Sequence, residues 1–484
     1  MPETNTTLDV IAVDLGNESG RVYKVSFDGA LLQGEELYRF PNIPVTLNGT
    51  LYWDALRLWH EIQTGLSAAL AAPVRGIGVD SFGVDFGLLD AHGNLISNPV
   101  HMRDSRTEGM MEWVFSQVGR AELYERTGIG FYVINTLYQL AAIKRDSPWQ
   151  LDITRTLLTM PNLINFWLTG QKLSEFTHTT TTQCYNPTLA DWDRDMLGRL
   201  GIGTTMFPPV VQPGHEIGLY QDVPVYTVAG HDTGSAVVAV PTQTPNFAYI
   251  SSGTWSLFGL ETFAPIITPA AREANITNEG GAYGTFRPLR MVMGLWLVQQ
   301  CRARWAEGGL NVGYDGLLAH MQDSAPFAAF IDPDDARFFP PGDMPGRVRA
   351  FCAETGQTIP ATVGGILRCV LESLALKYRY VLEKLIEVSG QPVDVLHIVG
   401  GGSQNAALCQ MTADATNRPV LAGPVEATAL GNGLVQLIAQ GELSDIGQAR
   451  AVMRASYPPT LYEPRDPKAW NSAYRRFQRL ITTP

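Results

Sequence analysis

Two segments of the chain, about half its length apart, follow the same plan. Residues 10–26 and 248–261 each contain an apolar run, a short turn of small polar residues and glycine, and a second run that alternates. This pattern predicts a β-hairpin whose turn tolerates unusual dihedral angles and exposes backbone N–H groups. Two hairpins so far apart indicate a duplicated domain rather than a short tandem repeat.

Helical patterns and short apolar strands alternate along the rest of the chain. Leu58, Ile62 and Leu66 recur at helical spacing after Asp54, which is expected to cap a helix that runs to Ala72. A second amphipathic stretch covers 365–389 and is expected to end at Gly390. Strands are expected at residues 75–80 and 394–399, each followed by a glycine turn. Strands that alternate with helices predict an α/β fold.

The length of 484 residues exceeds what one hydrophobic core usually holds, so at least two large domains are expected. We place them at 1–242 and 243–484, with residues 239–246 as the joint between the halves. Residues 325–350 are rich in Pro, Asp and Phe, and an irregular surface excursion is expected there.

Composition narrows the range of partners. Apolar residues make up 45% and charged residues 17% of the chain, and the net charge is −12. An acidic surface disfavours nucleic acid and anionic lipid, and no apolar run is long enough to cross a bilayer. The five cysteines show no CxxC spacing; Cys352 and Cys369 could meet, but reduced thiols in the cytoplasm are expected. Both a monomer and a homodimer remain open.

The turn of the first hairpin, from Asp14 to Arg21, has the composition of an anion site. Small residues can point several N–H groups at one anion, and a guanidinium suits phosphate. Asp14, at the end of the first strand, could hold Mg²⁺ directly or through water. The second turn, 251–256, offers the same groups. An ordinary hairpin is the alternative in each case, and the chain contains no P-loop motif.

Residues 225–235 carry the strongest candidate for catalysis. An apolar strand delivers His231, Asp232 and Thr233 at its carboxyl end, where α/β sheets collect ligands. A carboxylate there can accept the proton of an attacking hydroxyl. An aspartate before a helix can equally serve as its N-cap, and the residues alone leave both interpretations open.

Two further motifs are candidates for ligand contacts. Three glycines at 400–402 allow a ligand to approach the backbone closely. Gly83 could do the same for a small polar substrate, with Phe82 offering a face to a sugar ring. Structural pairing is preferred for the charged residues nearby, which are Asp80, Asp85, Arg103 and Arg106.

With these motifs in view, the chain resembles the FGGY carbohydrate kinases of the actin/hexokinase superfamily, and within them the rhamnulokinase-like branch. The resemblance extends from Val10 to about Glu442. It rests on ordered motifs such as VDLGNESGR (13–21), GHDTGSAV (230–237), SSGTWSL (251–257) and LHIVGGGSQN (396–405). It implies two ribonuclease-H-like domains around a cleft for ATP and sugar, and phosphorylation of L-rhamnulose by MgATP to L-rhamnulose 1-phosphate.

The resemblance also implies roles for single residues. Asp232 matches the proton acceptor, with Gly83, His231 and Thr233 as sugar contacts. The nucleotide-binding positions matched are Asn17, Glu18, Ser19, Gly20, Arg21, Thr254, Gln299 and Gly401.

Two positions depart from the pattern of this branch. Met291 stands where a sugar-binding asparagine is expected, and Phe82 replaces a tryptophan. Methionine supplies no amide hydrogen bond, so another ketose, such as L-fuculose, L-ribulose or xylulose, is an alternative substrate. A sugar or nucleotide sensor without catalytic activity is a further alternative.

Overall fold

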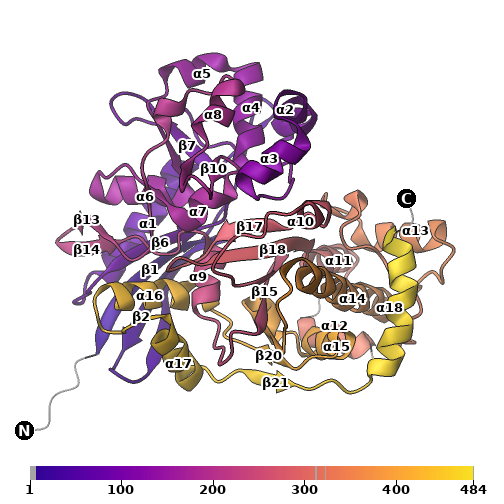
Figure 1. The fold of residues 1–484 in the computed structure, drawn as a ribbon. Coiled ribbons are helices and arrows are strands. Elements are labelled where there is room, and N and C mark those ends of the chain that lie inside the picture. The colour runs from indigo at the N-terminus through magenta and orange to yellow at the C-terminus, as the bar shows by residue number, and fades with distance from the viewer. Residues whose placement is uncertain (1–6, 311–312, 322, 483–484) are drawn as a thin grey trace, which may run out of the picture. The chain divides into compact units, whose positions relative to one another are not determined.

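The computed structural model describes residues 7–310, 313–321 and 323–482, and Figure 1 shows its helices and strands. The chain forms two compact units. Unit 1 contains Met1–Gln243, Glu261–Pro288 and Glu426–Tyr457, whereas unit 2 contains Thr244–Leu260, Leu289–Val425 and Pro458–Pro484. The chain first leaves unit 1 within the expected joint at 239–246, but two later segments return to it. The division into halves at 242/243 stays a prediction.

Unit 1 is built on a six-stranded sheet with the order β13-β14-β6-β1-β2-β3. Its strands are β1 (Leu8–Leu15), β2 (Ser19–Phe27), β3 (Leu32–Pro41), β6 (Ile77–Ser81), β13 (Glu216–Tyr220) and β14 (Val223–Tyr226). β1 pairs antiparallel with β2 and parallel with β6, and β14 pairs parallel with β6. The first predicted hairpin is therefore confirmed.

The remaining elements of unit 1 are smaller strands and the helices around the sheet. The strands are β4 (Val45–Leu47), β5 (Thr50–Tyr52), β7 (Phe86–Leu89), β8 (Thr156–Thr159), β9 (Ser174–Glu175), β10 (Tyr185–Asn186), β11 (Asp191–Trp192), β12 (Val210–Val211) and β17 (Thr277–Gly280). The helices are α1 (Ala55–Ala69), α2 (Met110–Val118), α3 (Arg120–Thr127), α4 (Thr136–Asp146), α5 (Pro148–Ile153), α6 (Met160–Thr169), α7 (Phe176–Thr181), α8 (Arg194–Arg199), α9 (Asp232–Val238), α10 (Pro269–Glu273), α16 (Ala427–Ala439) and α17 (Ile446–Ser456).

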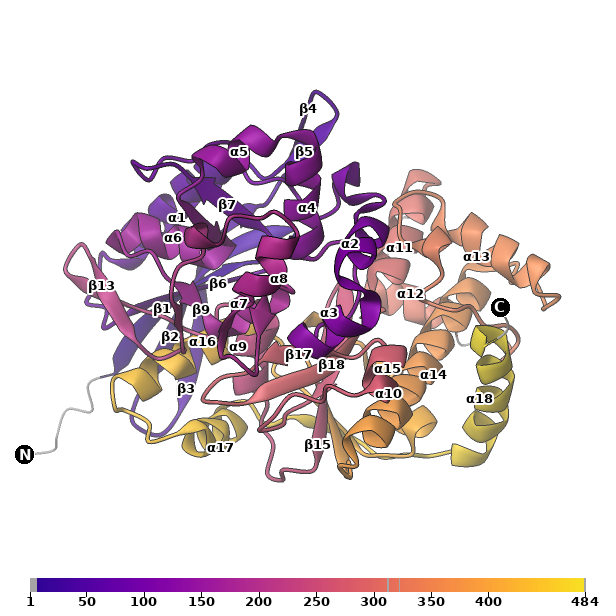
Figure 2. The same cartoon turned by 45° about the horizontal axis from the view of Figure 1, so that its top comes forward.

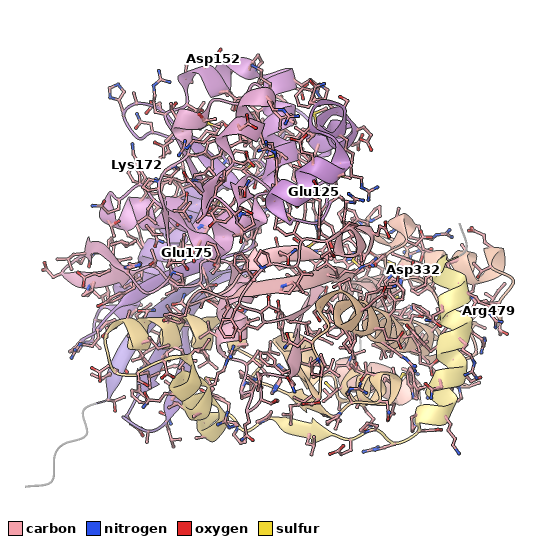
Figure 3. The ribbon with its side chains drawn as sticks, in the orientation of Figure 1. Glu125, Asp152, Lys172, Glu175, Asp332 and Arg479 are labelled. Carbon is pink, nitrogen blue, oxygen red and sulfur yellow. The ribbon has the colours of Figure 1, made fainter. Side chains whose placement is uncertain are left out.

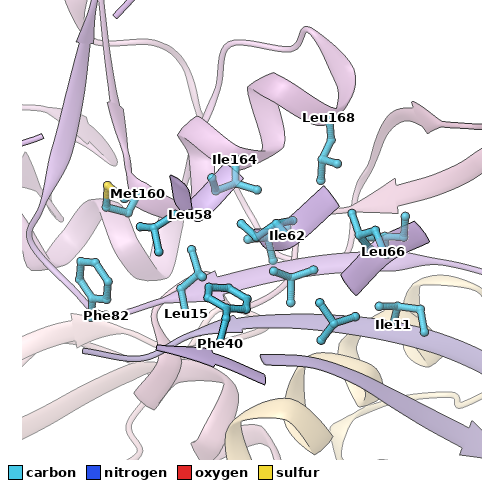
Figure 4. Packing of buried hydrophobic residues seen from close by; sticks show 14 of the residues in the cluster. Ile11, Leu15, Phe40, Leu58, Ile62, Leu66, Phe82, Met160, Ile164 and Leu168 are labelled. Atoms are coloured by element: carbon cyan, nitrogen blue, oxygen red, sulfur yellow. The ribbon is translucent and has the colours of Figure 1, made fainter. Parts of the chain in front are cut away.

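Helices cover both faces of β1, which explains why nearly all of its residues are buried. Ile11, Val13 and Leu15 share a core with Ile62 and Leu66 of α1 (Figure 4). The helix begins after Asp54, whose side chain accepts a hydrogen bond from Arg57 N, so the predicted cap is confirmed.

The opposite face of β1 is covered by a helix from far along the chain. α16 packs against β1, β2 and α9, and α17 contacts β3 and α9. These two yellow helices lie beside the indigo strands β2 and β3 in both views (Figure 1 and Figure 2). The chain therefore returns to complete the core of unit 1 after it has built most of unit 2.

A second mixed sheet has seven strands in the order β17-β18-β16-β15-β19-β20-β21, and all of them except β17 and the start of β18 belong to unit 2. Its strands besides β17 are β15 (Phe247–Ser252), β16 (Trp255–Leu260), β18 (Phe286–Met293, which begins in unit 1), β19 (Val395–Val399), β20 (Val420–Ala422) and β21 (Thr460–Tyr462). The helices of unit 2 are α11 (Trp296–Glu307), α12 (Tyr314–Met321), α13 (Met344–Glu354), α14 (Val363–Ser389), α15 (Ala406–Thr416) and α18 (Pro467–Thr482). The second hairpin and the α/β class are thus confirmed.

The long helix α14 follows its sequence pattern closely. Thr362 caps its first turn by accepting from Gly365 N, and Gly390 ends it in the left-handed conformation. Tyr378 lies on the buried face and its hydroxyl is 2.6 Å from Ser256 Oγ of β16. The predicted helix at 365–389 is confirmed, with two further residues at its start.

One prediction about the fold is only partly right. Residues 325–343 are irregular apart from a short 3₁₀ turn, as expected, but Phe330, Ile331 and Phe338 are buried rather than exposed, and α13 begins at Met344. All five cysteines are free and buried. None of the helices, in the part of the chain that the structure describes, is long and apolar enough to span a membrane.

The close contact between α16 and α9 predicts that adding one methyl group at Gly431 strongly lowers the stability of unit 1. A Cβ at Gly431 would overlap the carbonyl oxygen of Ser235. We expect Gly431→Ala to lower the stability of unit 1 by about 1–3 kcal/mol, because backbone must move. Thermal unfolding measures the effect. Gly198→Ala in α8 meets open space and is the matched control; an equal loss of stability in both variants would contradict the packing argument.

Candidate functional site

Three carboxylates gather at one edge of the sheet of unit 1. Asp14 and Asp80 are register neighbours near the ends of the parallel strands β1 and β6. Ser81, the next residue, forms a β-bridge with His231, which brings Asp232 to the same edge. Asp14 and Asp80 are buried. Parallel strands that end together thus collect acids from three distant parts of the sequence.

Neighbouring groups compensate this concentration of acid. Burial, followed by the charge of Asp14, raises the pKa of Asp80 well above its ordinary value, and Asn432 Nδ2 of α16 donates to Asp80 Oδ2 over 2.6 Å. The guanidinium of Arg21 forms ion pairs with Asp14 and with Glu426. Two carboxylates therefore fix the orientation of Arg21.

The predicted phosphate turn lies directly beside these acids. Asn17 and Glu18 form its tip, which is closed by a hydrogen bond from Gly16 N to Ser19 O of 3.0 Å. Ser19 Oγ accepts from Arg39 NH1, and Gly20 packs against the ring of Phe40. The structure thus brings the turn together with Asp14 and Arg21.

Asp232 is the first residue of α9, and His231 occupies the N-cap position. The interpretation of Asp232 as the N-cap residue is therefore wrong. Its Oδ1 accepts from the backbone N and the Oγ1 of Thr233, over 2.5 and 3.1 Å. Burial raises the pKa of Asp232 above its ordinary value, His231 opposes that shift and Asp14 adds to it. A carboxylate with a raised pKa at a strand end is suited to accept a proton.

Gly83 and His231 lie against each other. A Cβ at Gly83 would come within 3.2 Å of His231 Nε2, and the same nitrogen is 3.3 Å from Asp232 Oδ1. The four predicted residues Gly83, His231, Asp232 and Thr233 therefore form one group in unit 1.

A buried glutamate that the sequence did not single out holds the backbone behind this group. Glu175 precedes α7 (Figure 3) and its Oε2 accepts from Gly230 N over 3.0 Å and from Thr177 Oγ1 over 2.7 Å. The hydroxyl of Thr177 in turn accepts from His231 N over 3.1 Å. No sequence pattern could reveal this link, because 54 residues separate Thr177 from His231.

The expectation for Phe82 is not met. Its ring is 1% exposed and stacks on Trp53 at 4.4 Å between centroids, so it faces the core and not a sugar. The structural interpretation of Asp85 is confirmed, since it accepts from Trp53 Nε1, Met102 N and Gln139 Nε2. Arg106 reaches Asp85 through the Gln139 amide.

The nucleotide-binding candidates of unit 2 surround the second hairpin. Thr254 O accepts from Gly294 N and Trp296 N over 3.2 Å each, so the turn lies against the start of α11. Gln299 lies one helical turn further along, and its Oε1 is buried without a hydrogen-bond partner among the described residues. The structure thus brings Thr254 and Gln299 to one region. Met291 is in β18 of the same unit, opposite Leu257 in register.

The three consecutive glycines serve different purposes. Gly400 has a φ of +81°, and a Cβ there would be 3.0 Å from Ser252 O. A Cβ at Gly402 would overlap the Ser252 side chain, whereas one at Gly401 meets nothing within 4 Å in the described chain. Gly400 and Gly402 are therefore required by the hairpin, and Gly401 alone faces open space.

Among the described residues, no group of three or more His, Cys, Asp or Glu side chains is arranged to hold a metal ion. Magnesium bound to a nucleotide needs only one or two protein carboxylates and keeps several waters. The buried Asp14, beside Asp80, has the donor chemistry for that role.

Two mixed α/β units, one with a buried acid at its strand ends and the other with a glycine-rich turn, are typical of kinases that phosphorylate small molecules. The comparisons agree. The model of the FGGY family of carbohydrate kinases, N-terminal domain, matches residues 10–240, and that of the C-terminal domain matches residues 248–440. The chain therefore belongs to the FGGY family of carbohydrate kinases, and it is an enzyme of that kind.

Similar proteins extend over almost the whole chain. It is 41% identical over 482 residues to a rhamnulokinase of Bacteroides thetaiotaomicron, covering 97% of this chain and 99% of that protein. It is 42% identical over 483 residues to a rhamnulokinase of Pectobacterium atrosepticum, covering 98% and 96%.

Solved structures share the fold at low sequence identity. The gluconate kinase of Lactobacillus acidophilus superimposes with a TM-score of 0.81 at 16% identity, covering 98% of this chain and 97% of that chain. The glycerol kinase of Plasmodium falciparum with ADP gives 0.78 at 13% identity, covering 99% of each.

The glycine run yields a paired prediction. We expect Gly402→Ala to destabilise unit 2 by about 1–3 kcal/mol, because Ser252 and its strand must shift. Gly401→Ala should change stability by less than about 0.5 kcal/mol, since its methyl group enters open space. Urea unfolding of both variants measures the difference. Equal destabilisation would show that Gly401 is also packed, contrary to the geometry.

Proposed function

We propose that the chain transfers the γ-phosphate of MgATP to the primary hydroxyl of a ketose, L-rhamnulose, with Asp232 as the catalytic base. The observation that carries this proposal is the position of Asp232 at the strand ends of unit 1. There it is partly buried, with 29% of its side chain exposed, has a raised pKa and lies beside His231. All three features suit a group that must take a proton from an alcohol during phosphoryl transfer.

The choice of sugar is supported by relatives. Two rhamnulokinases share 41 and 42% of their residues with this chain over nearly their whole length. Gly83, His231 and Thr233 would contact the sugar, because they adjoin Asp232 and a small ligand can approach the backbone at a glycine. The side chain of Met291 would leave one sugar hydroxyl without the amide partner of related kinases.

The nucleotide would be held by the turns of the two hairpins, which supply backbone N–H groups for phosphate. Asn17 to Arg21 are proposed in unit 1, and Thr254, Gln299 and Gly401 in unit 2. Asp14 would hold Mg²⁺, which neutralises phosphate charge when it is bound. The five free cysteines suit a reducing compartment, and we propose the cytoplasm.

In the reaction, Asp232 accepts the proton of the primary hydroxyl as its oxygen approaches phosphorus. His231 orients the sugar at the same carboxylate. Exclusion of water from the site would prevent hydrolysis of ATP.

Replacement of the base tests the proposal directly. Asp232→Asn keeps the shape and most hydrogen bonds but cannot accept the proton, so turnover should fall by about 10² or more. ATP affinity should change little. Sugar-dependent ADP release measures turnover, and calorimetry measures nucleotide binding.

Asp152→Asn is the matched control. Asp152 is an exposed residue of α5 (Figure 3), and its variant should retain full turnover. Near-normal turnover of Asp232→Asn would remove Asp232 from the role of base.

A panel of ketoses tests the sugar. We expect kcat/KM for L-rhamnulose to exceed that for L-fuculose, L-ribulose and xylulose by about tenfold or more, because a buried polar site rejects a sugar that leaves its groups unpaired. Comparable values for several sugars would contradict the assignment of L-rhamnulose and favour a broader ketose kinase. Binding of sugar or ATP without ADP release from any ketose would instead indicate a sensor.

A further inference from the structure

A buried ion pair adjoins the ring of His231. Glu279 of β17 and Arg287 of β18 are joined by a contact of 3.1 Å between Glu279 Oε2 and Arg287 NH2. The side chain of Arg287 is fully buried and that of Glu279 is 7% exposed. All three residues belong to unit 1. Burying two charges costs several kcal/mol per ion before their attraction is counted.

The arginine is held in one orientation. Its Nε donates to Gly280 O over 2.8 Å, and its NH2 donates to Glu279 Oε2. Its NH1 is buried and has no acceptor within the described ranges. A buried guanidinium that is held in this orientation can in turn fix a neighbouring group, which gives it a role in the site.

That role is visible at the imidazole. Nδ1 of His231 lies 3.1 Å from Glu279 Oε2 and 3.0 Å from Arg287 NH2. Nε2, the opposite nitrogen, lies 3.3 Å from Asp232 Oδ1. Glu279 and Arg287 therefore contact the ring at Nδ1, and Nε2 on the opposite edge faces the carboxylate of Asp232.

The two partners of Nδ1 differ in hydrogen-bonding chemistry. A carboxylate only accepts and a guanidinium only donates, so Nδ1 finds a partner whether or not it carries a proton. Burial alone would raise the pKa of Glu279, but His231 and Arg287 outweigh burial and hold that pKa below its ordinary value. Glu279 is thus a carboxylate beside the ring.

We infer that Glu279 and Arg287 are positioning residues, which orient His231 so that its Nε2 can bind a sugar hydroxyl beside Asp232. This inference rests on the proposed function, because it assumes that His231 contacts the sugar. It adds two residues, from a hairpin about 50 positions further along the chain, to the group that determines sugar binding.

The test uses Glu279→Gln, which keeps the volume of the side chain and removes its charge. We expect KM for L-rhamnulose to rise by about tenfold or more, because loss of a well-placed hydrogen bond to a charged or buried group has that effect. KM for ATP should remain unchanged. The double variant Glu279→Gln with Arg287→Met removes both charges. It leaves no unpaired charge in the interior, so a higher KM in this variant reflects the lost orientation of His231 and not a weakened fold.

The matched control is another largely buried pair of unit 1, Glu261 and Arg450, joined over 2.9 Å with side chains 11 and 10% exposed. Glu261→Gln should leave both KM values unchanged. The inference is overturned if Glu279→Gln and the double variant fold and bind sugar as the parent does. It is also overturned if Glu261→Gln raises the KM for the sugar by the same factor.

A second readout does not depend on catalysis. In the protein labelled with ¹⁵N-histidine, the ring signals of His231, assigned with His231→Gln, should shift in Glu279→Gln and stay in place in Glu261→Gln. Unchanged signals would overturn the positioning role. If the ring signals shift but no ketose supports ADP release by the parent protein, the proposed function fails and the contact between Glu279 and His231 stands.

Discussion

The arrangement of unit 1 depends on the cost of bringing acids together at the ends of parallel strands. The register that pairs β1 with β6 makes Asp14 and Asp80 neighbours, and the bridge between Ser81 and His231 adds Asp232. Buried carboxylates repel one another and lose their hydration. The surrounding structure supplies a compensating group for each: Arg21 for Asp14, Asn432 for Asp80 and Thr233 for Asp232.

Much of that compensation comes from the late segment of the chain. Glu426 fixes Arg21 from its other side, and Asn432 in α16 donates to Asp80. The helix reaches the acids because Gly431 allows it to contact the backbone of α9 at Ser235. A chain that returned without this glycine could not pack α16 so closely. The close packing of α16 on α9 is therefore what allows Asn432 and Glu426 to stabilise the charged groups at the strand ends.

The local part of the fold could be predicted from sequence. Asp54, Thr362 and Gly390 define helix ends because capping depends on residues within one turn. The hairpins at Asp14 and Thr254 follow from alternation and turn residues. The buried segment around Phe330 and Phe338 was not predictable, because proline and aspartate dominate its composition while its aromatic rings find partners only in the folded unit.

The sequence by itself determined the family, the two hairpins and the position of Asp232 at a strand end, since each depends on residues close together in the chain or on ordered motifs. Only the tertiary structure decided that His231, and not Asp232, occupies the N-cap position of α9. It also decided that Phe82 faces the core, and that Glu279 and Arg287 contact Nδ1 of the His231 ring. These contacts join residues about 30 to 55 positions apart, and such contacts leave no periodic trace in a sequence because hydrogen bonds and ring packing act only over a few ångströms.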